Sequence, residues 1–128
     1  MITFTLPGIP PSANMYWRHN QGRTHISEEG IEWREYVAVF GPSVQLTGDL
    51  FLDIALYLPD RRRDPDNTIK SMQDSLQYSR IVKNDRQIRD VRAHAAGIDK
   101  ENPRTVITLG ALEQWPEWIM KQLERREQ

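Results

Sequence analysis

The sequence of 128 residues contains no cysteine. This absence excludes disulfide bonds, thiolate zinc sites and cysteine nucleophiles, and it fits a reducing cytoplasm. The three histidines, His19, His25 and His94, lack the spacing of metal ligands. No apolar run is long enough to span a membrane, and the N-terminus lacks the charged start and long apolar stretch of a signal peptide. We therefore expect a cytoplasmic protein that folds without disulfides and does not enter a membrane.

Net charge is also small, at −1, which by itself is weak evidence against a nucleic-acid-binding protein. The charge is unevenly distributed, however. Between Arg61 and Arg92 there are nine Lys or Arg and five Asp, so this segment carries +4 while the rest of the chain carries −5. A polyanion responds to the local field, so a basic rim around a group of carboxylates favours binding of a phosphate chain. The alternative is an ordinary solvated face with salt bridges.

The most informative segment is Asp60–Asn67, which contains three carboxylates, three consecutive arginines and one proline. A further carboxylate, Asp85, follows nineteen residues after Asp66. Carboxylates two residues apart in an extended segment project to the same side, and Mg²⁺ typically takes one or two carboxylates and fills its remaining positions with water or phosphate. Arginine supplies a fork that holds the phosphate. The leading hypothesis is a metal-dependent enzyme that acts on a nucleic-acid backbone.

Hydrophobic periodicity predicts an α+β fold, a small mixed sheet flanked by helices, in one domain over residues 1–128. Residues 7–25 are expected to form a long loop, because prolines and glycine interrupt its start. Asp66 is expected to be the N-cap of a helix that runs to Tyr78. The expected strands are 2–6, 50–58, 91–95 and 105–109, the last two joined as a hairpin by the turn 99–103, and the other expected helices are 28–40 and 115–127.

Several separated motifs follow one another in this order: Pro10-Pro11-Ser12-Ala13-Asn14, Arg18 followed by Gly22-Arg23 and Ser27, Pro59-Asp60-Arg61-Arg62-Arg63 leading into Asp64-Pro65-Asp66-Asn67, Lys70, and Asp85 followed by Gln87. With these motifs the chain resembles the RusA-type Holliday junction resolvases, which are small endonucleases carried by bacteria and prophages. The resemblance runs from the first strand to about residue 110, and it leaves the last helix outside.

This resemblance implies specific roles for four residues. Asp64, Asp66 and Asp85 are expected to bind Mg²⁺, with Mn²⁺ as a substitute, and Lys70 is expected to be required for cleavage. It also implies a homodimer whose two sites nick opposite strands of a four-way DNA junction in recombination and repair. The family often has two adjacent acids at the third carboxylate, where this chain has Asn84-Asp85.

Other residues are candidates for contacts around the site. Asn67 is expected to hydrogen-bond to a metal ligand or to belong to the first helical turn, and Asp74 is expected to pair with Lys70 one turn before it. The expected DNA contacts are Asn14, Arg18, Arg23, Arg61, Arg62 and Arg63. A solvated charge run is the alternative explanation for the three consecutive arginines.

Three other functions compete with a nuclease. A non-catalytic DNA-binding phage accessory protein that kept the fold would have no reason to maintain three repelling aspartates beside Lys70. A calcium-binding loop starting at Asp64 would need glycine at its sixth position and glutamate at its twelfth, where this chain has Ile69 and Ser75. A nucleotide-sugar transferase with an Asp-x-Asp motif would need a second domain, for which the chain is too short.

Overall fold

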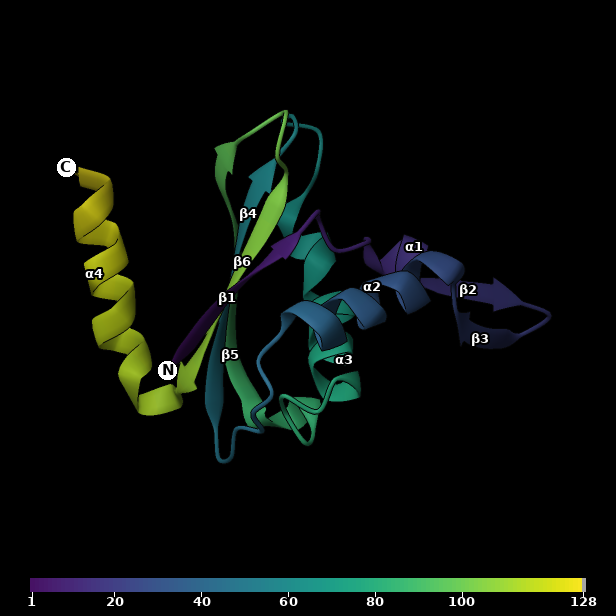
Figure 1. Cartoon of the computed structure of the whole chain (residues 1–128), viewed down its shortest axis with the longest axis horizontal. Helices are drawn as coiled ribbons and strands as arrows, with labels where there is room; N and C mark the ends of the chain where they lie inside the picture. Colours follow the sequence, from purple (N-terminus) through teal and green to yellow (C-terminus); the bar gives the residue numbers. More distant parts are fainter. Residues whose placement is uncertain (128) are drawn as a thin grey trace.

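The computed structural model describes residues 1–127, with side chains through residue 125. Four strands form one mixed sheet in the order β1-β6-β4-β5, and two short strands form a separate hairpin, β2–β3 (Figure 1). The strands are β1 (Ile2–Pro7), β2 (Trp17–Asn20), β3 (Arg23–Ile26), β4 (Leu50–Leu58), β5 (Ile88–Ile98) and β6 (Arg104–Ala111). The α-helices are α1 (Ala13–Tyr16), α2 (Glu28–Phe40), α3 (Ile69–Tyr78) and α4 (Trp115–Glu127), and the short 3-10 helices are η1 (Pro65–Thr68), η2 (Asp85–Gln87) and η3 (Leu112–Gln114). The expected α+β class is confirmed.

Strand β4 is the centre of the sheet, because it pairs on both sides. It is parallel to β5 and antiparallel to β6. The hairpin expected from residues 91–95 and 105–109 is therefore wrong, since β4 lies between these two strands. An apolar strand buried in a sheet needs partners for both of its rows of backbone groups, and the segment between β5 and β6 crosses over the end of β4 to provide the second one.

Helices α2 and α3 cover one face of the sheet. Alternate residues of β4, from Leu50 to Leu58, point into this layer and are buried with Trp33 and Val37 of α2 and with Met72 and Leu76 of α3. This is the amphipathic arrangement that the apolar periods predict. The helix α2 has the expected bounds, and Ser27 caps it by accepting a hydrogen bond from the Gly30 N–H at 3.0 Å.

The opposite face of the sheet is contacted by α4. Phe51, which points away from the core side of β4, stacks on Trp115 at a ring-centroid distance of 4.6 Å and lies 5.6 Å from Trp118. The remainder of α4 extends beside the sheet rather than across it (Figure 1). Within residues 1–127, no helix is long and apolar enough to cross a membrane.

The expected loop over residues 7–25 is wrong in its second half. Residues 17–26 form the β2–β3 hairpin, in which Trp17 is paired with Ile26 and Asn20 with Arg23. The strands are only four residues each and mostly polar. Such short strands carry too little alternation of apolar and polar residues to be recognised by their period.

Candidate active site

Asp64 and Asp66 lie together where the segment after β4 turns into η1. Asp64 has extended backbone dihedral angles, φ −85° and ψ 117°, and its Oδ1 accepts a hydrogen bond from the Asp66 N–H at 3.0 Å. The expectation that Asp66 is the N-cap is therefore wrong, because Asp64 is the cap and Pro65 occupies the first helical position. Proline favours that position because it has no N–H to leave unsatisfied. Both aspartates are exposed to solvent.

Lys70 lies in the first turn of α3 and is also exposed. The expected pairing of Lys70 with Asp74 is wrong. Asp74 instead accepts hydrogen bonds from Arg34 Nη2 at 2.8 Å and Nε at 3.1 Å, and from the hydroxyl of Tyr16. Asp74 pairs with Arg34 because the planar guanidinium group of Arg34 reaches across from α2 and binds the carboxylate with two nitrogens. Lys70 thus follows Asp66 by four residues, in the first turn of α3, and the carboxylate of Asp74 is bound by Arg34 and Tyr16.

Asp85 lies at the other end of α3. It is exposed and begins η2, and its N–H donates to Oε1 of Gln77 at 2.9 Å. Its neighbour Asn84 is the N-cap of η2 and accepts from the Arg86 N–H at 2.9 Å. The position at which the family often has a second acid is therefore a capping position here, for which asparagine is well suited.

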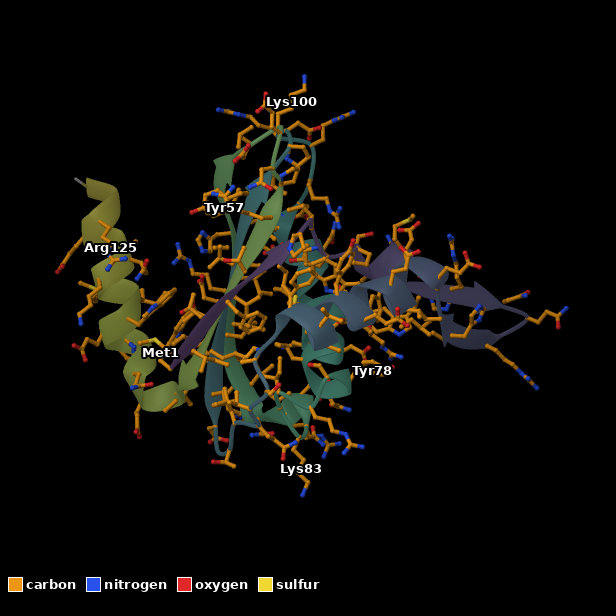
Figure 2. All side chains as sticks on the ribbon, viewed as in Figure 1. Met1, Tyr57, Tyr78, Lys83, Lys100 and Arg125 are labelled. Atoms are coloured by element: carbon orange, nitrogen blue, oxygen red, sulfur yellow. The ribbon has the colours of Figure 1, made fainter. Side chains whose placement is uncertain are left out.

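The third aspartate is thus separated from the first two by the length of a helix. Asp66 precedes α3, and Gln77 is in its last turn, so the ten residues of α3 span about 15 Å between the two ends. Figure 2 shows Lys83, two residues before Asp85, at one end of the molecule. Lys100, which lies in the turn between β5 and β6, is at the opposite end. Among the residues that the structure describes, no three His, Cys, Asp or Glu side chains group so that they could hold a metal ion. The metal-binding role of the three aspartates stays a prediction.

The donor chemistry of Asp64 and Asp66 nevertheless fits Mg²⁺. Two exposed carboxylates two residues apart supply hard oxygen ligands, and Mg²⁺ needs only one or two carboxylates when water and phosphate fill its remaining positions. The chain folds so that Asp85 cannot join them from the same molecule. One chain therefore offers two separate parts of the expected ligand set, Asp64 with Asp66 at one end of α3 and Asp85 at the other.

The three arginines before Asp64 have different surroundings. Arg61 and Arg62 are exposed, and Arg62 binds Asp60 through Nη2 at 2.7 Å and Nε at 3.0 Å. These hydrogen bonds hold the pKa of Asp60 below its usual range. Arg63 is partly buried and donates to the carbonyl oxygen of Pro10, and burial lowers its pKa. Arg63 therefore fixes the segment before the aspartates against the N-terminal loop.

The remaining predicted residues lie on η1, on α1 and on the β2–β3 hairpin. Asn67 is in η1, is exposed, and donates its N–H to the carbonyl oxygen of Asp64 at 3.3 Å. Asn14 is exposed in α1, which contacts α3. Arg18 and Arg23 are exposed on the β2–β3 hairpin. Their contacts with DNA stay predictions.

Sequence reasoning missed the cluster of Tyr16, Arg34 and Asp74. The ring of Tyr16 is fully buried, and its hydroxyl lies between the Asp74 carboxylate and Arg34 Nε, which is 2.9 Å away. Burial, together with the hydrogen bond to Asp74, raises the pKa of Tyr16 to about 12. These residues are 18 and 40 positions apart along the chain, so no local spacing could have predicted their meeting.

A second polar cluster lies on the sheet face beside α4. Asp53 is buried, and its Oδ2 is 3.1 Å from His94 Nε2, while Arg92 Nη1 is 3.8 Å from its Oδ1. The alternation of β4 gives a hint of it, since an aspartate interrupts an otherwise apolar strand. The contacts of Asp53 with Arg92 and His94 join β4 to β5 across the sheet face.

Known proteins match most of this chain, including the candidate site. The family model of endodeoxyribonuclease RusA matches residues 7–110. The chain is 40% identical over 95 residues to crossover junction endodeoxyribonuclease RusA of Escherichia coli strain K12, covering 70% of this chain and 78% of that protein. It is 42% identical over 93 residues to the protein of the same name from Enterobacteria phage 82, covering 69% and 77%.

The family match includes β4, β5 and nearly all of β6, the hairpin, α3 and all of the predicted metal and catalytic residues, so the chain is an endodeoxyribonuclease. It belongs to the RusA family, which confirms the resemblance found in the sequence motifs. Helix α4 lies outside the matched residues.

Proposed function

We propose that this protein is a Mg²⁺-dependent resolvase that nicks two opposing strands of a four-way DNA junction as a homodimer. The observation that carries the proposal is the exposed pair Asp64 and Asp66, followed by Lys70, within a chain of the RusA family. Relatives from a bacterium and a bacteriophage are named crossover junction endodeoxyribonucleases. These sources, together with the lack of cysteine, support action in the bacterial cytoplasm.

The proposed metal site is shared between two subunits. A two-fold axis perpendicular to α3 and next to it would make the two copies of this helix antiparallel, so that the start of one lies beside the end of the other. Asp64 and Asp66 of one subunit would then meet Asp85 of the second. The separation of these residues along α3 supports this arrangement, because a single chain leaves Asp85 about 15 Å away. The symmetry gives two sites per dimer, which is what paired nicks require.

The chemistry assigns separate tasks to the residues of each site. The three carboxylates would hold the cation, which when bound supplies charge compensation at the phosphate and activates water. Lys70, four residues after Asp66 and in the first turn of α3, would stabilise negative charge that develops on the scissile phosphate. Asn67 would hold the Asp64 turn in place through its hydrogen bond to the Asp64 carbonyl oxygen.

DNA binding is assigned to basic side chains that do not need the metal. Arg61, in the segment before Asp64, is exposed, and the segment from Arg61 to Arg92 has a charge of +4. Affinity for DNA should then persist in EDTA and fall about tenfold or more between 50 and 200 mM salt, because binding releases counterions from the DNA and this release is less favourable at higher salt. An affinity that does not change over this range would contradict the assignment.

The test is cleavage of labelled DNA by the purified protein. A four-way junction, a linear duplex of the same sequence and a single strand are each incubated with Mg²⁺ or with EDTA. We expect symmetric nicks in the junction with Mg²⁺ and no cleavage with EDTA. Cleavage in EDTA, or equal cleavage of the duplex, would overturn the proposal. Binding to the junction without cleavage under any condition would support the non-catalytic accessory protein instead.

A further inference from the structure

The β2–β3 hairpin has one face on which all side chains are polar and none is acidic. In an antiparallel pair, residues directly opposite each other point to the same side, and successive residues point to opposite sides. Arg18 is opposite His25, and Asn20 is opposite Arg23. These four side chains therefore share one face, which we call the reader face.

The residue types of the reader face are those that recognise base edges. Arginine binds guanine with two hydrogen bonds in the major groove, and asparagine binds adenine in the same way. All four side chains are exposed to solvent. The hairpin itself contains no Asp or Glu. The carboxylates beside it are Glu28 and Glu29 at the start of α2, which line a pocket with Arg18 and His25.

The opposite face of the hairpin has a structural role. Trp17 and Ile26 are paired at its root and pack against the core, and His19 Nδ1 is 2.9 Å from the hydroxyl of Thr24 near its tip. The hairpin projects away from the sheet beyond α1 and α2 (Figure 1). A ribbon of two strands has the width that the major groove accommodates. Asn20 and Arg23 lie next to the projecting tip, whereas Arg18 and His25 are nearer the root and line a pocket with the start of α2.

Both ends of the hairpin have a defined backbone geometry. At its tip, Gln21 (φ 51°) and Gly22 (φ 76°) form a two-residue turn with two positive φ angles, the type that matches the twist of paired strands. At its root, the Ser27 N–H donates to the Tyr16 carbonyl oxygen at 2.9 Å. A Cβ on Gly30 would lie 2.7 Å from the same oxygen, so only glycine permits this close approach.

The hairpin root is also connected to the helix of the candidate site. Tyr16, immediately before β2, hydrogen-bonds through its hydroxyl to Asp74 of α3, and Asp74 lies one turn after Lys70. The hairpin therefore has a fixed position relative to Asp66 and Lys70. A base contact made by the reader face would select the sequence that lies at the scissile phosphate.

We propose that the reader face enters the major groove of a DNA arm and reads base edges, so that the hairpin sets the sequence preference of cleavage. This inference rests on the proposed junction cleavage and adds to it the source of specificity. Arg18 and Asn20 are the central readers, because they lie on the same strand, two residues apart, and point into the same groove. Arg23 and His25 flank them on the second strand.

The experiment maps nick positions on four-way junctions whose cores carry many different sequences. The variants are Asn20→Ala, which changes no charge, and Arg18→Ala. His19→Gln is the control for the opposite face of the hairpin, and Arg125→Ala on α4 is the control for the loss of one positive charge. Thermal melting of each variant establishes that it is folded. Junction affinity is measured in EDTA.

We expect Asn20→Ala and Arg18→Ala to reduce the ratio of nicking rates at preferred and non-preferred sequences about tenfold, the size of one good base contact. Metal-free affinity of Asn20→Ala should stay within about twofold of the parent protein, because the phosphate contacts that dominate affinity are intact. Both controls should keep the parent ratio. Three results would overturn the proposal. The parent protein could show no sequence preference, both reader variants could keep the parent ratio of nicking rates, or His19→Gln could change that ratio as much as the reader variants do.

A second readout separates this proposal from the proposed cleavage. Methylation by dimethyl sulfate probes guanine N7, which lies in the major groove. In the metal-free complex with a junction, the parent protein should protect guanines in the arms, and Arg18→Ala should lose part of that protection while Arg125→Ala keeps it. Protection without nicking would overturn only the cleavage proposal. Nicking without any arginine-dependent protection would overturn only the role of the hairpin.

Discussion

The hydroxyl of Tyr16 donates a hydrogen bond to the carboxylate of Asp74, and this contact connects the root of the β2–β3 hairpin with α3. Arg34 of α2 completes the connection by binding both groups. Three elements that are distant in the sequence are therefore held together at one point. This point is next to Lys70 but does not include any predicted metal ligand.

Tyr16→Phe should lower the free energy of unfolding by about 1–3 kcal/mol, because Asp74 and Arg34 lose a buried partner. The ring still fills its place in the core, so the fold should be retained. Chemical denaturation at neutral pH measures the difference. A variant as stable as the parent protein would show that the hydroxyl contact contributes nothing to stability.

Stability should depend on Tyr16 ionisation at high pH. The pKa of Tyr16 is raised from 10.0 to about 12 in the folded protein, mainly by burial and by Asp74. The stabilising effect of the protonated hydroxyl is fully present below pH 10 and is lost as pH rises toward 12. In this window the free energy of unfolding should fall by at most about 1.4 kcal/mol per pH unit from this group. Tyr16→Phe is the control and should show a smaller slope; equal slopes would contradict the assignment.

Substitutions of Asp64, the N-cap of η1, and of Asp66 within η1 should distinguish helix capping from metal binding. Asp64→Asn should keep the cap, whereas Asp64→Ala should lose about 1 kcal/mol of stability. Asp66→Asn should leave the melting temperature almost unchanged, because Asp66 is exposed and is not the cap. All three variants should lose nicking activity. A large drop in the melting temperature of metal-free Asp66→Asn would show that this carboxylate is structural and not a ligand.

Helix α4 should matter for stability more than for catalysis, because it lies outside the residues that match the family. Trp115→Ala removes the stack on Phe51 and should lower the free energy of unfolding by about 1–3 kcal/mol. The nicking rate at 25 °C should stay within about twofold of the parent rate if the folded population remains high. A folded variant that has lost its activity would assign α4 a role in the site or the dimer.

The sequence predicted those elements whose periodicity is strong. The helix from Glu28 to Phe40 and the strand from Leu50 to Leu58 have the expected bounds because each presents a regular apolar face to one core. Strand neighbours were not predictable in the same way. Because β5 and β6 are consecutive in the chain, they were expected to pair. In the structure β4 lies between them and pairs with both.

The residues of the candidate site were predicted, but their arrangement was not. Spacing correctly placed Asp64 and Asp66 at the end of a strand segment and the start of a helix. The turn after α3 determines where Asp85 lies. Asn84 and Gln87 form a capping box, which has a local signature, but the contact of Gln77 with the Asp85 N–H joins this turn to α3 and has none. The long-range contact of Asp74 with Arg34 was missed for the same reason.

Mixing two inactive variants tests the shared site most directly. Asp66→Asn and Asp85→Asn should each be inactive alone. In a mixed dimer, one site combines both substitutions, while the other site combines the native Asp66 of one subunit with the native Asp85 of its partner. After subunit exchange, about a quarter of all sites should be intact, since half of the dimers are mixed and each holds one native site.

The measurement is the rate of junction nicking by the exchanged mixture with Mg²⁺, compared with each variant alone and with a mixture of Asp64→Asn and Asp66→Asn. The shared site predicts recovery of single nicks to about a quarter of the parent rate in the first mixture and none in the second, because two substitutions in the same part of the ligand set leave no intact site in the dimer. A first mixture that stays inactive, although exchange is demonstrated with labelled subunits, would contradict a metal site built from two subunits.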